Sequence, residues 1–352
     1  DGKMGVFGPT IVLVALCVHP SHSLSASNVF FDTQGRLLRS GAGSSAPRLY
    51  LPVFDGHSLL HEVLPGAWEA VLLTSEQVAS FTAPGQGALQ ARIGLSSTGS
   101  PMAQRGELLG AAEPPAFYLL ELSHLAQPPD GESLGAPDGS EWRQLRSAAQ
   151  VSVLDHLRDD DEAALLATAR GLALWHSSNG FCSACGAPTQ PARDGTIRTC
   201  GSCGARHRPR LDNAIIVLVT DGQGRCLLGR KGSWPEGRYS TLSGFLDFGE
   251  TLEECVVREV REESGVAVNR ASIRYVASHP WLFPRSLMVG FIAQADNVEL
   301  GDGDDELADV RWFSREEVAS CVEAAAEAPL FHVPSKVSLA YTIIQQWLRE
   351  TV

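Results

Sequence analysis

Residues 244–266, GFLDFGETLEECVVREVREESGV, hold more acidic side chains in one short stretch than any other part of the sequence. A glycine-bounded loop comes first. Thr251, with Glu254 three residues later, is typical of a capping box at a helix N-terminus, and Gly265 suits a helix C-terminus. The stretch therefore predicts a loop, a helix and an abrupt stop.

Two glutamates of this helix fall on its apolar face. Because successive residues turn by about 100° around a helix, Glu259 and Glu263 lie within the stripe formed by Val256 and Val260. Glu262 flanks that stripe.

The opposite face of the helix carries Glu254, Arg258 and Arg261. We expect it to be solvated. The spacing of Glu254 and Arg258 favours an ion pair between them.

The two inward-facing carboxylates need a compensating cation. Burying an unpaired carboxylate is costly, and like charges one helical turn apart repel. Oxygen ligands of this kind suit magnesium or manganese, which hold phosphate oxygens and activate water. The alternative is a salt-bridged surface helix rich in Glu and Arg.

The full spacing favours the metal site. Gly244, Glu250 and the run REVREESGV at residues 258–266 occupy every fixed position of the Nudix box. The chain thus resembles the Nudix hydrolase superfamily, which cleaves nucleoside diphosphates linked to another group.

Four cysteines form two CxxC pairs, each followed by glycine: Cys182, Cys185, Cys200 and Cys203. Their spacing lets two zinc knuckles converge on one ion. Because all four donors are sulfur, no position is left for water, and the zinc is expected to be structural. The alternative is two local disulfides or free thiols.

The same stretch is the basic region of an acidic chain, through Arg193, Arg198, Arg206, His207, Arg208 and Arg210. These residues are expected either to contact substrate phosphates or RNA, or only to balance nearby acids.

Three further features are similar to the NADH pyrophosphatase family. They are the four-cysteine ribbon ahead of the box, the lead-in ALWH…FC..CG, and SHPWLFPRS at residues 278–286, where the family signature is SQPWPFPxS. The resemblance covers the chain from residue 161 to its end, and the preceding region only in general layout.

This resemblance implies a role for each matching residue. Glu259, Glu263 and Glu306, with the main-chain carbonyl of Ser243, would hold the magnesium or manganese ions. Glu262 or Glu263 would position or deprotonate the attacking water.

The resemblance also implies a substrate pocket. Phe245 would stack on the nicotinamide, and Ala340 would line the pocket. The proline-stiffened loop would let Trp281 and Phe283 stack on a flat base, although such a loop also suits plain packing. The loop residues expected to bind substrate are His279, Pro280, Trp281, Leu282, Phe283, Pro284, Arg285 and Ser286.

Three positions depart from the family pattern. His279 replaces Gln, Leu282 replaces Pro, and Arg208 stands where the family has Tyr. The cleavage chemistry is expected to survive these changes, whereas the ranking of NADH, NAD and NAD-capped RNA stays open.

The expected activity is hydrolysis of NADH or NAD to a nicotinamide mononucleotide and AMP. Two alternatives remain: a Nudix enzyme for another dinucleotide such as ADP-ribose or coenzyme A, and an RNA-binding decapping protein that uses the basic ribbon. Family members are typically homodimers, so the resemblance implies a homodimer here.

The fold class expected is α/β. Short apolar runs, RLYLPVF, AWEAVLLT and AFYLLELS, predict strands of an N-terminal α/β, Nudix-like domain. The Ala- and Leu-rich residues 161–176 predict a helix with an acidic cap. Alternating strands and helices after the ribbon fit the α/β/α sandwich of a Nudix domain. The expected divisions are a leader or disordered N-terminus at 1–27, an N-terminal domain at 28–155, a connecting helix at 156–178, a zinc ribbon at 179–211 and a Nudix domain at 212–352.

Composition limits the possible partners and the cellular compartment of the protein. The 352 residues are 44% hydrophobic and carry a net charge of −13, which argues against broad nucleic-acid binding. Eight unevenly placed cysteines favour a reducing, intracellular compartment, cytoplasmic or organellar. The apolar residues 6–18 fit a targeting leader or a buried first strand equally well. They are too few to span a bilayer as a helix, and no membrane partner is expected.

Overall fold

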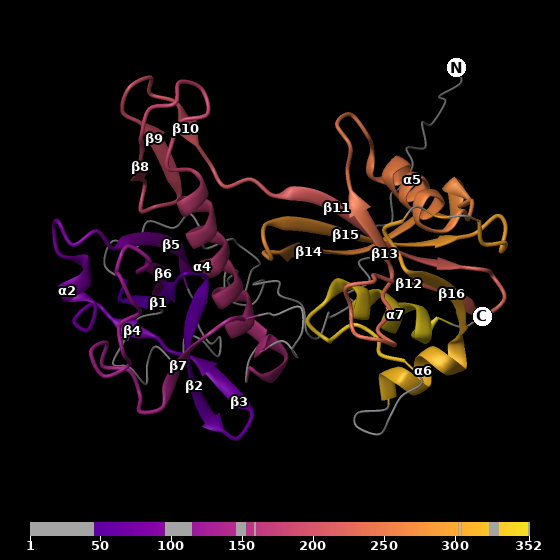
Figure 1. Ribbon diagram of the computed structural model, residues 1–352, viewed down its shortest axis with the longest axis horizontal. Helices are drawn as coiled ribbons and strands as arrows, with labels where there is room; N and C mark the ends of the chain where they lie inside the picture. Colours follow the sequence, from indigo (N-terminus) through magenta and orange to yellow (C-terminus); the bar gives the residue numbers. More distant parts are fainter. Residues whose placement is uncertain are drawn as a thin grey trace, which may run out of the picture.

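The computed structural model describes residues 46–95, 115–145, 153–157, 160–301, 303, 305–323 and 331–350. The leader or first strand expected at residues 6–18 lies outside them. Two sheet-based domains are joined through a long helix and a small ribbon (Figure 1). No helix in the described ranges has the length and apolar character to cross a membrane.

The N-terminal domain is built on a seven-stranded sheet. Its main order is β3-β2-β1-β6-β5, with β4 beside β1 and β7 beside β2. The pair β1 and β6 is parallel, and the other pairs are antiparallel. The three predicted apolar runs form β1, β3 with β4, and β6. The strands are β1 (Arg48–Phe54), β2 (His57–Leu64), β3 (Ala67–Ala70), β4 (Leu73–Thr74), β5 (Leu89–Leu95), β6 (Ala116–Glu121) and β7 (Ser140–Arg143). Two short helical turns, α2 (Ala79–Thr82) and η2 (Val153–His156), accompany them.

Helix α4 (Asp160–Ser178) crosses one face of this sheet (Figure 1). The predicted helix at residues 161–176 is confirmed, but it is more than a connection. Its Ala and Leu side chains are buried on nearly all sides, in one cluster with residues of β1, β5 and β6. A helix that is apolar all round belongs in a core, so α4 is part of the N-terminal domain.

The ribbon is a three-stranded sheet in the order β10-β9-β8, formed by β8 (Thr189–Ala192), β9 (Ile197–Cys200) and β10 (Arg206–His207). The turn between β8 and β9, at the end away from the cysteines, contacts the N-terminal domain. There the Arg92 N–H donates to the Asp194 carbonyl at 2.7 Å. Gly195 in this turn has φ +73°, and a Cβ there would lie 2.4 Å from the Gln90 carbonyl oxygen. Only glycine allows so close a contact.

The C-terminal domain has a six-stranded mixed sheet in the order β14-β15-β11-β12-β16, with β13 on β11. The pair β11 and β15 is parallel. Strands β11 and β12 form an antiparallel hairpin. The strands are β11 (Asp212–Thr220), β12 (Arg225–Arg230), β13 (Leu242–Phe245), β14 (Arg274–Trp281), β15 (Ser286–Gln294) and β16 (Asp309–Ser314).

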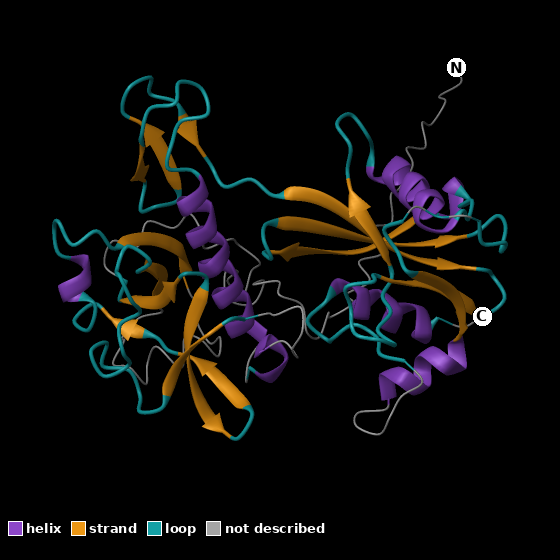
Figure 2. Ribbon diagram, in the orientation of Figure 1, coloured by secondary structure: helices purple, strands orange, loops and turns teal. Residues whose placement is uncertain are grey.

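Helices cover both faces of this sheet (Figure 2). Helix α5 (Leu252–Ser264) packs on one face through Cys255, Val256 and Val260. Helices α6 (Arg315–Glu323) and α7 (Leu339–Arg349) pack on the other, and the short turn η3 (Arg270–Ser272) follows α5. The expected α/β/α sandwich is confirmed.

The loop predicted at residues 278–286 is shorter in the structure. Residues 278–281 belong to strand β14 and Ser286 begins β15, so only residues 282–285 form a turn. Pro280 is compatible with a strand because β14 lies at the edge of the sheet, where one side needs no backbone N–H.

Candidate functional site

Helix α5 is fixed at both ends as predicted. The Thr251 hydroxyl accepts the Glu254 N–H at 3.2 Å, and the Glu254 carboxylate accepts the Thr251 N–H at 2.9 Å. Gly265 adopts φ 72° and donates to the Arg261 carbonyl at 2.8 Å. The capping box and the left-handed glycine set where the helix begins and ends.

The two predicted inward glutamates are buried. Glu259 is 8% exposed and Glu263 is 3% exposed. The Glu259 carboxylate occupies the space above Gly244 of β13, because a Cβ at that glycine would lie 1.8 Å from Glu259 Cδ. The glycine that begins the box therefore makes room for the carboxylate of the helix.

Arg258 is the cation that these acids share. Its guanidinium donates to both oxygens of Glu250 at 2.8 Å, to Glu259 at 2.8 Å and to Glu262 at 2.9 Å. It also donates to the Phe245 carbonyl at 2.9 Å. One planar guanidinium thus joins the loop to the helix.

This arrangement corrects the prediction for the far face of α5. Arg258 does not lie on a purely solvated face beside Glu254. Glu254 instead pairs with Arg270 at 3.6 Å. The long Arg258 side chain turns towards the glycine-bounded loop, where Glu250 binds it with two hydrogen bonds.

The charges in this cluster oppose one another. Burial is the main effect that raises the pKa of Glu259; Arg258 lowers it, while the negative charges of Glu262 and Glu306 raise it further. The hydrogen bonds from Arg258 lower the pKa of Glu250 to about 2. Glu250 is thereby a fixed anion, whereas Glu259 is crowded by other carboxylates.

The oxygen donors suit a hard divalent cation, because three carboxylates and a strand carbonyl are the ligand types of magnesium and manganese. Ser243 lies in β13 opposite Ile216. Glu306 forms an ion pair with Lys231. The four cysteine sulfurs all lie within 4.8 Å of one another. Among the described residues, the carboxylate oxygens of Glu259, Glu263 and Glu306 do not lie that close together. The divalent site stays a prediction.

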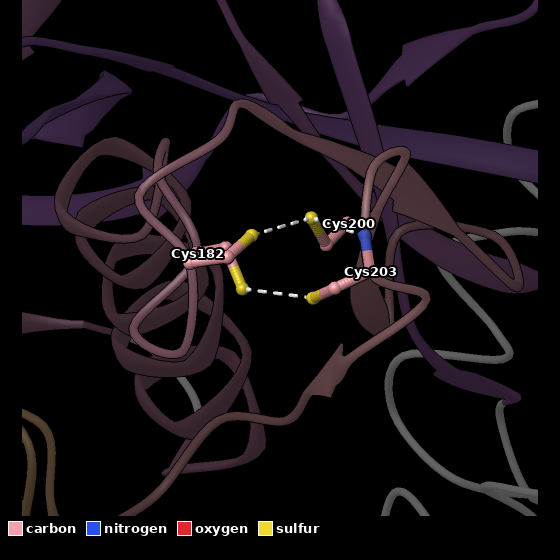
Figure 3. A group of neighbouring side chains, drawn as sticks. Cys182, Cys200 and Cys203 are labelled. Atoms are coloured by element: carbon pink, nitrogen blue, oxygen red, sulfur yellow. Dashed lines mark hydrogen bonds between the residues drawn. The ribbon is translucent and has the colours of Figure 1, made fainter.

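The four cysteine sulfurs converge at the end of the ribbon (Figure 3). Cys182 and Cys203 Sγ lie 3.6 Å apart, and Cys185 and Cys200 Sγ lie 3.5 Å apart. A tetrahedral zinc with Zn–S bonds near 2.3 Å would separate its sulfurs by about 3.8 Å. The sulfurs therefore fit one structural zinc, as predicted, and all four residues are free thiols.

The glycine after each CxxC closes a knuckle. Gly186 and Gly204 have φ of 74° and 73° and donate to the carbonyls of Cys182 and Cys200. The Cys203 N–H is the main cause that lowers the pKa of the Cys200 thiol to about 6, whereas the neighbouring cysteine side chains raise the pKa of Cys203 to about 12. Without zinc, Cys200 is therefore the thiol of this pair that ionises first.

The basic residues of the ribbon fall into two groups. Arg198 points inward, donating to Thr189 Oγ1 at 2.7 Å and to His176 Nδ1 at 3.1 Å. Arg193, Arg206, Arg208 and Arg210 are exposed, and His207 is half-buried. Arg198 thus belongs to the ribbon framework, and only the exposed group suits phosphate contacts.

Phe245 is 59% exposed and borders a cavity of about 580 Å³ that Asp212 and Phe248 also line. Phe248, fully exposed on the box loop, and Arg258 are site residues that the sequence analysis missed. The second phenylalanine of GFLDFGE was the available signal for Phe248.

The predicted substrate loop lies against the N-terminal domain. Trp281, Leu282 and Phe283 pack on the core that contains α4. Pro280 is half-buried, Pro284 is exposed, and Ser286 is buried. The rings of Trp281 and Phe283 make packing contacts in this structure, so their stacking on a base stays a prediction.

The remaining predicted substrate residues are placed as follows. Burial lowers the pKa of His279 to about 4, so its ring is neutral near pH 7. Arg285 pairs with Asp212 at 3.0 Å. Ala340 is buried in the core beneath α7, so its side chain faces other core residues. Its place in a pocket stays a prediction.

The sandwich with its glycine-bounded loop and acidic helix, and the ribbon ahead of it, are each similar to a known family. Residues 209–333 match the family described as NUDIX domain, and residues 177–207 match the NADH pyrophosphatase zinc ribbon domain. Residues 177–333 are therefore similar to a zinc ribbon followed by a NUDIX domain.

Two named relatives share this region. The NAD-capped RNA hydrolase NudC of Mycobacterium bovis is 42% identical over 206 residues, covering 57% of this chain and 65% of that protein. The human NAD-capped RNA hydrolase NUDT12 is 38% identical over 199 residues, covering 54% of this chain and 42% of that protein. The chain thus spans less than two thirds of the length of either relative.

Proposed function

We propose that this protein hydrolyses the diphosphate of NADH or NAD to a nicotinamide mononucleotide and AMP, and that it removes NAD caps from RNA. The observation that carries the proposal is the buried pair Glu259 and Glu263, with Glu259 seated over Gly244, in a chain that also carries the NADH pyrophosphatase zinc ribbon. Both relatives are named as NAD-capped RNA hydrolases, which supports the proposal.

Glu259, Glu263 and Glu306, with the Ser243 carbonyl, would hold magnesium or manganese. When bound, such an ion neutralises the diphosphate and lowers the pKa of water. The water oxygen adds to one phosphorus, and the bond from that phosphorus to the bridging oxygen breaks. Glu262 or Glu263 takes the proton of the water, and the departing phosphate oxygen becomes part of the second monophosphate.

Arg258 prepares the carboxylates for this step. Its hydrogen bonds to Glu259 and Glu262 limit their rotamers before substrate arrives. Phe245, which is exposed beside the cavity, would stack on the nicotinamide, and residues 279–286 with Ala340 would complete the pocket. We further propose that the protein is a homodimer. We also propose a reducing intracellular compartment, because reducing conditions keep the zinc-binding cysteines from forming disulfides.

A substrate panel tests this function. Purified protein is given NADH, NAD, ADP-ribose, coenzyme A or NAD-capped RNA, each with magnesium or manganese, and products are separated. We expect NADH, NAD and the capped RNA to be cleaved. A preference for ADP-ribose or coenzyme A would assign the chain to another dinucleotide.

Glu263→Gln should abolish turnover while the protein still folds, because the amide keeps the shape and loses the charge. Glu253→Gln on the exposed side of α5 is the matched control. Near-normal cleavage of NADH by the Glu263 variant would refute the assigned role.

A second candidate, RNA gripping by the ribbon, is favoured by the exposure of Arg206, Arg208 and Arg210. Replacing these three arginines by glutamine should weaken processing of NAD-capped RNA and leave NADH cleavage as it was. Equal RNA processing by both proteins would end this idea.

A further inference from the structure

The hydrophobic core of the N-terminal domain extends into the Nudix domain at two places. Trp281, Leu282 and Phe283 of the substrate loop pack on it, and Val337 is one of its buried members. Val337 lies just ahead of α7, which carries Ala340. Both segments that are proposed for the substrate pocket are therefore anchored in the N-terminal domain.

One residue of α4 makes the specific contacts. The Arg170 guanidinium donates to the Leu282 carbonyl at 3.0 Å and lies 4.9 Å from the centre of the Phe283 ring. Arg170 is half-buried, and this burial lowers the pKa of its guanidinium. The hydrogen bond holds the backbone of the loop at Leu282, and the cation–π contact holds the Phe283 side chain.

The neighbouring residue allows this approach. A Cβ on Gly171 would lie 3.2 Å from Leu282 Cβ, closer than most such contacts. The missing side chain of Gly171 lets the α4 backbone lie close to Leu282, and Arg170 adds a hydrogen bond to the Leu282 carbonyl.

We infer that the N-terminal domain orders the substrate loop, and that Arg170 is the positioning residue through which it does so. The inference rests on the proposed function for its effect on turnover. A loop fixed before the dinucleotide binds loses less conformational entropy on binding. The effect should therefore fall on substrate affinity rather than on the cleavage step, which the glutamates of α5 perform.

Kinetics with NADH tests this division of roles. Arg170→Ala should raise KM about tenfold and change kcat less than about threefold, and Arg170→Lys should recover part of the loss by keeping a donor for Leu282. Arg143→Ala is the matched control, because Arg143 also lies over a ring, that of Trp68 at 4.0 Å, in the same domain but away from the loop. An unchanged KM in Arg170→Ala would overturn the inference.

Hydrogen exchange tests the loop itself without substrate. Peptides covering residues 278–287 should exchange faster in Arg170→Ala than in the wild type or in Arg143→Ala, while peptides from β11 should not change. Equal exchange in the loop would overturn the inference even if kinetics changed. If the wild type cleaves none of the panel substrates, the proposed function fails, and this measurement still decides whether Arg170 orders the loop.

Discussion

The Glu259 carboxylate occupies the position that a side chain on Gly244 would take, with the missing Cβ only 1.8 Å from Glu259 Cδ. The backbone of Gly244 is not left-handed, so conformational freedom does not explain the glycine. Its function is to leave space for the carboxylate. The box glycine and the box glutamate are therefore one structural unit.

Gly244→Ala should displace Glu259 and disable the site. Moving a catalytic group by about 1 Å lowers activity roughly 100-fold, and overpacking a buried site costs about 1–3 kcal/mol of unfolding free energy. Steady-state hydrolysis and urea denaturation measure the two effects. Gly232→Ala is the control, because a Cβ there meets only Ala308 Cβ at 3.7 Å. Wild-type activity in the Gly244 variant would show that the carboxylate position is unimportant.

Replacing Arg258 should destabilise the protein. In Arg258→Gln, the carboxylates of Glu250 and Glu259 lose the cation that they share. Their side chains are only 12% and 11% exposed, so water cannot fully replace it. Removing one partner of a largely buried ion pair costs roughly 3 kcal/mol. Chemical denaturation measures it.

The control for Arg258 is Arg261→Gln on the same helix. Arg261 is exposed and should change the unfolding free energy by less than about 0.5 kcal/mol. Equal stabilities of the two variants would mean that the Arg258 network contributes nothing.

Local features of this fold were predictable from the sequence. The capping box at Thr251, the stop at Gly265 and the inward glutamates follow from spacing along one helix. The zinc knuckles follow from spacing within two short turns. Each depends on residues that are close in the chain, so periodicity and turn chemistry determine them.

Contacts between distant residues were not predictable. Arg170 and Leu282 are 112 positions apart, and no pattern in either segment indicates the other. Arg258 was assigned to the solvated face because helical periodicity fixes where its Cβ points, not where a long flexible side chain ends. The same limit applies to α4, whose apolar surface could not reveal which sheet it covers.

Removing zinc should unfold the ribbon and leave both sheets folded. The sulfurs of the two knuckles face one another, and structural zinc supplies much of the folding free energy of such small units. Cys200→Ser should lose bound zinc, measured by elemental analysis, and become cleavable by protease between residues 179 and 211. The exposed Ser202→Ala in the same knuckle is the control. Full zinc content in Cys200→Ser would contradict a four-sulfur site.

His176 links α4 to the ribbon and should make stability depend on pH. Its Nδ1 faces the Arg198 guanidinium at 3.1 Å, and its Nε2 faces the Gly195 carbonyl at 2.8 Å. Because a guanidinium can only donate, Nδ1 accepts, and the neutral ring donates from Nε2. Burial is the main cause that lowers the pKa of His176 from 6.5 to about 4, and Arg198 lowers it further.

The direction of the pH effect follows from this lowered pKa. Between pH 6.5 and pH 4 the unfolded chain binds a proton at His176 that the folded protein does not, so stability is present above this range and is lost as pH falls through it. From pH 7 to pH 5 the loss from His176 should be about 2 kcal/mol. The unfolding free energies of His176→Gln and of the wild type are measured by urea denaturation in saturating zinc. Between pH 7 and pH 5, the free energy of the variant should fall by about 2 kcal/mol less than that of the wild type. Parallel pH profiles of the two proteins would show that His176 is not held neutral between α4 and the ribbon.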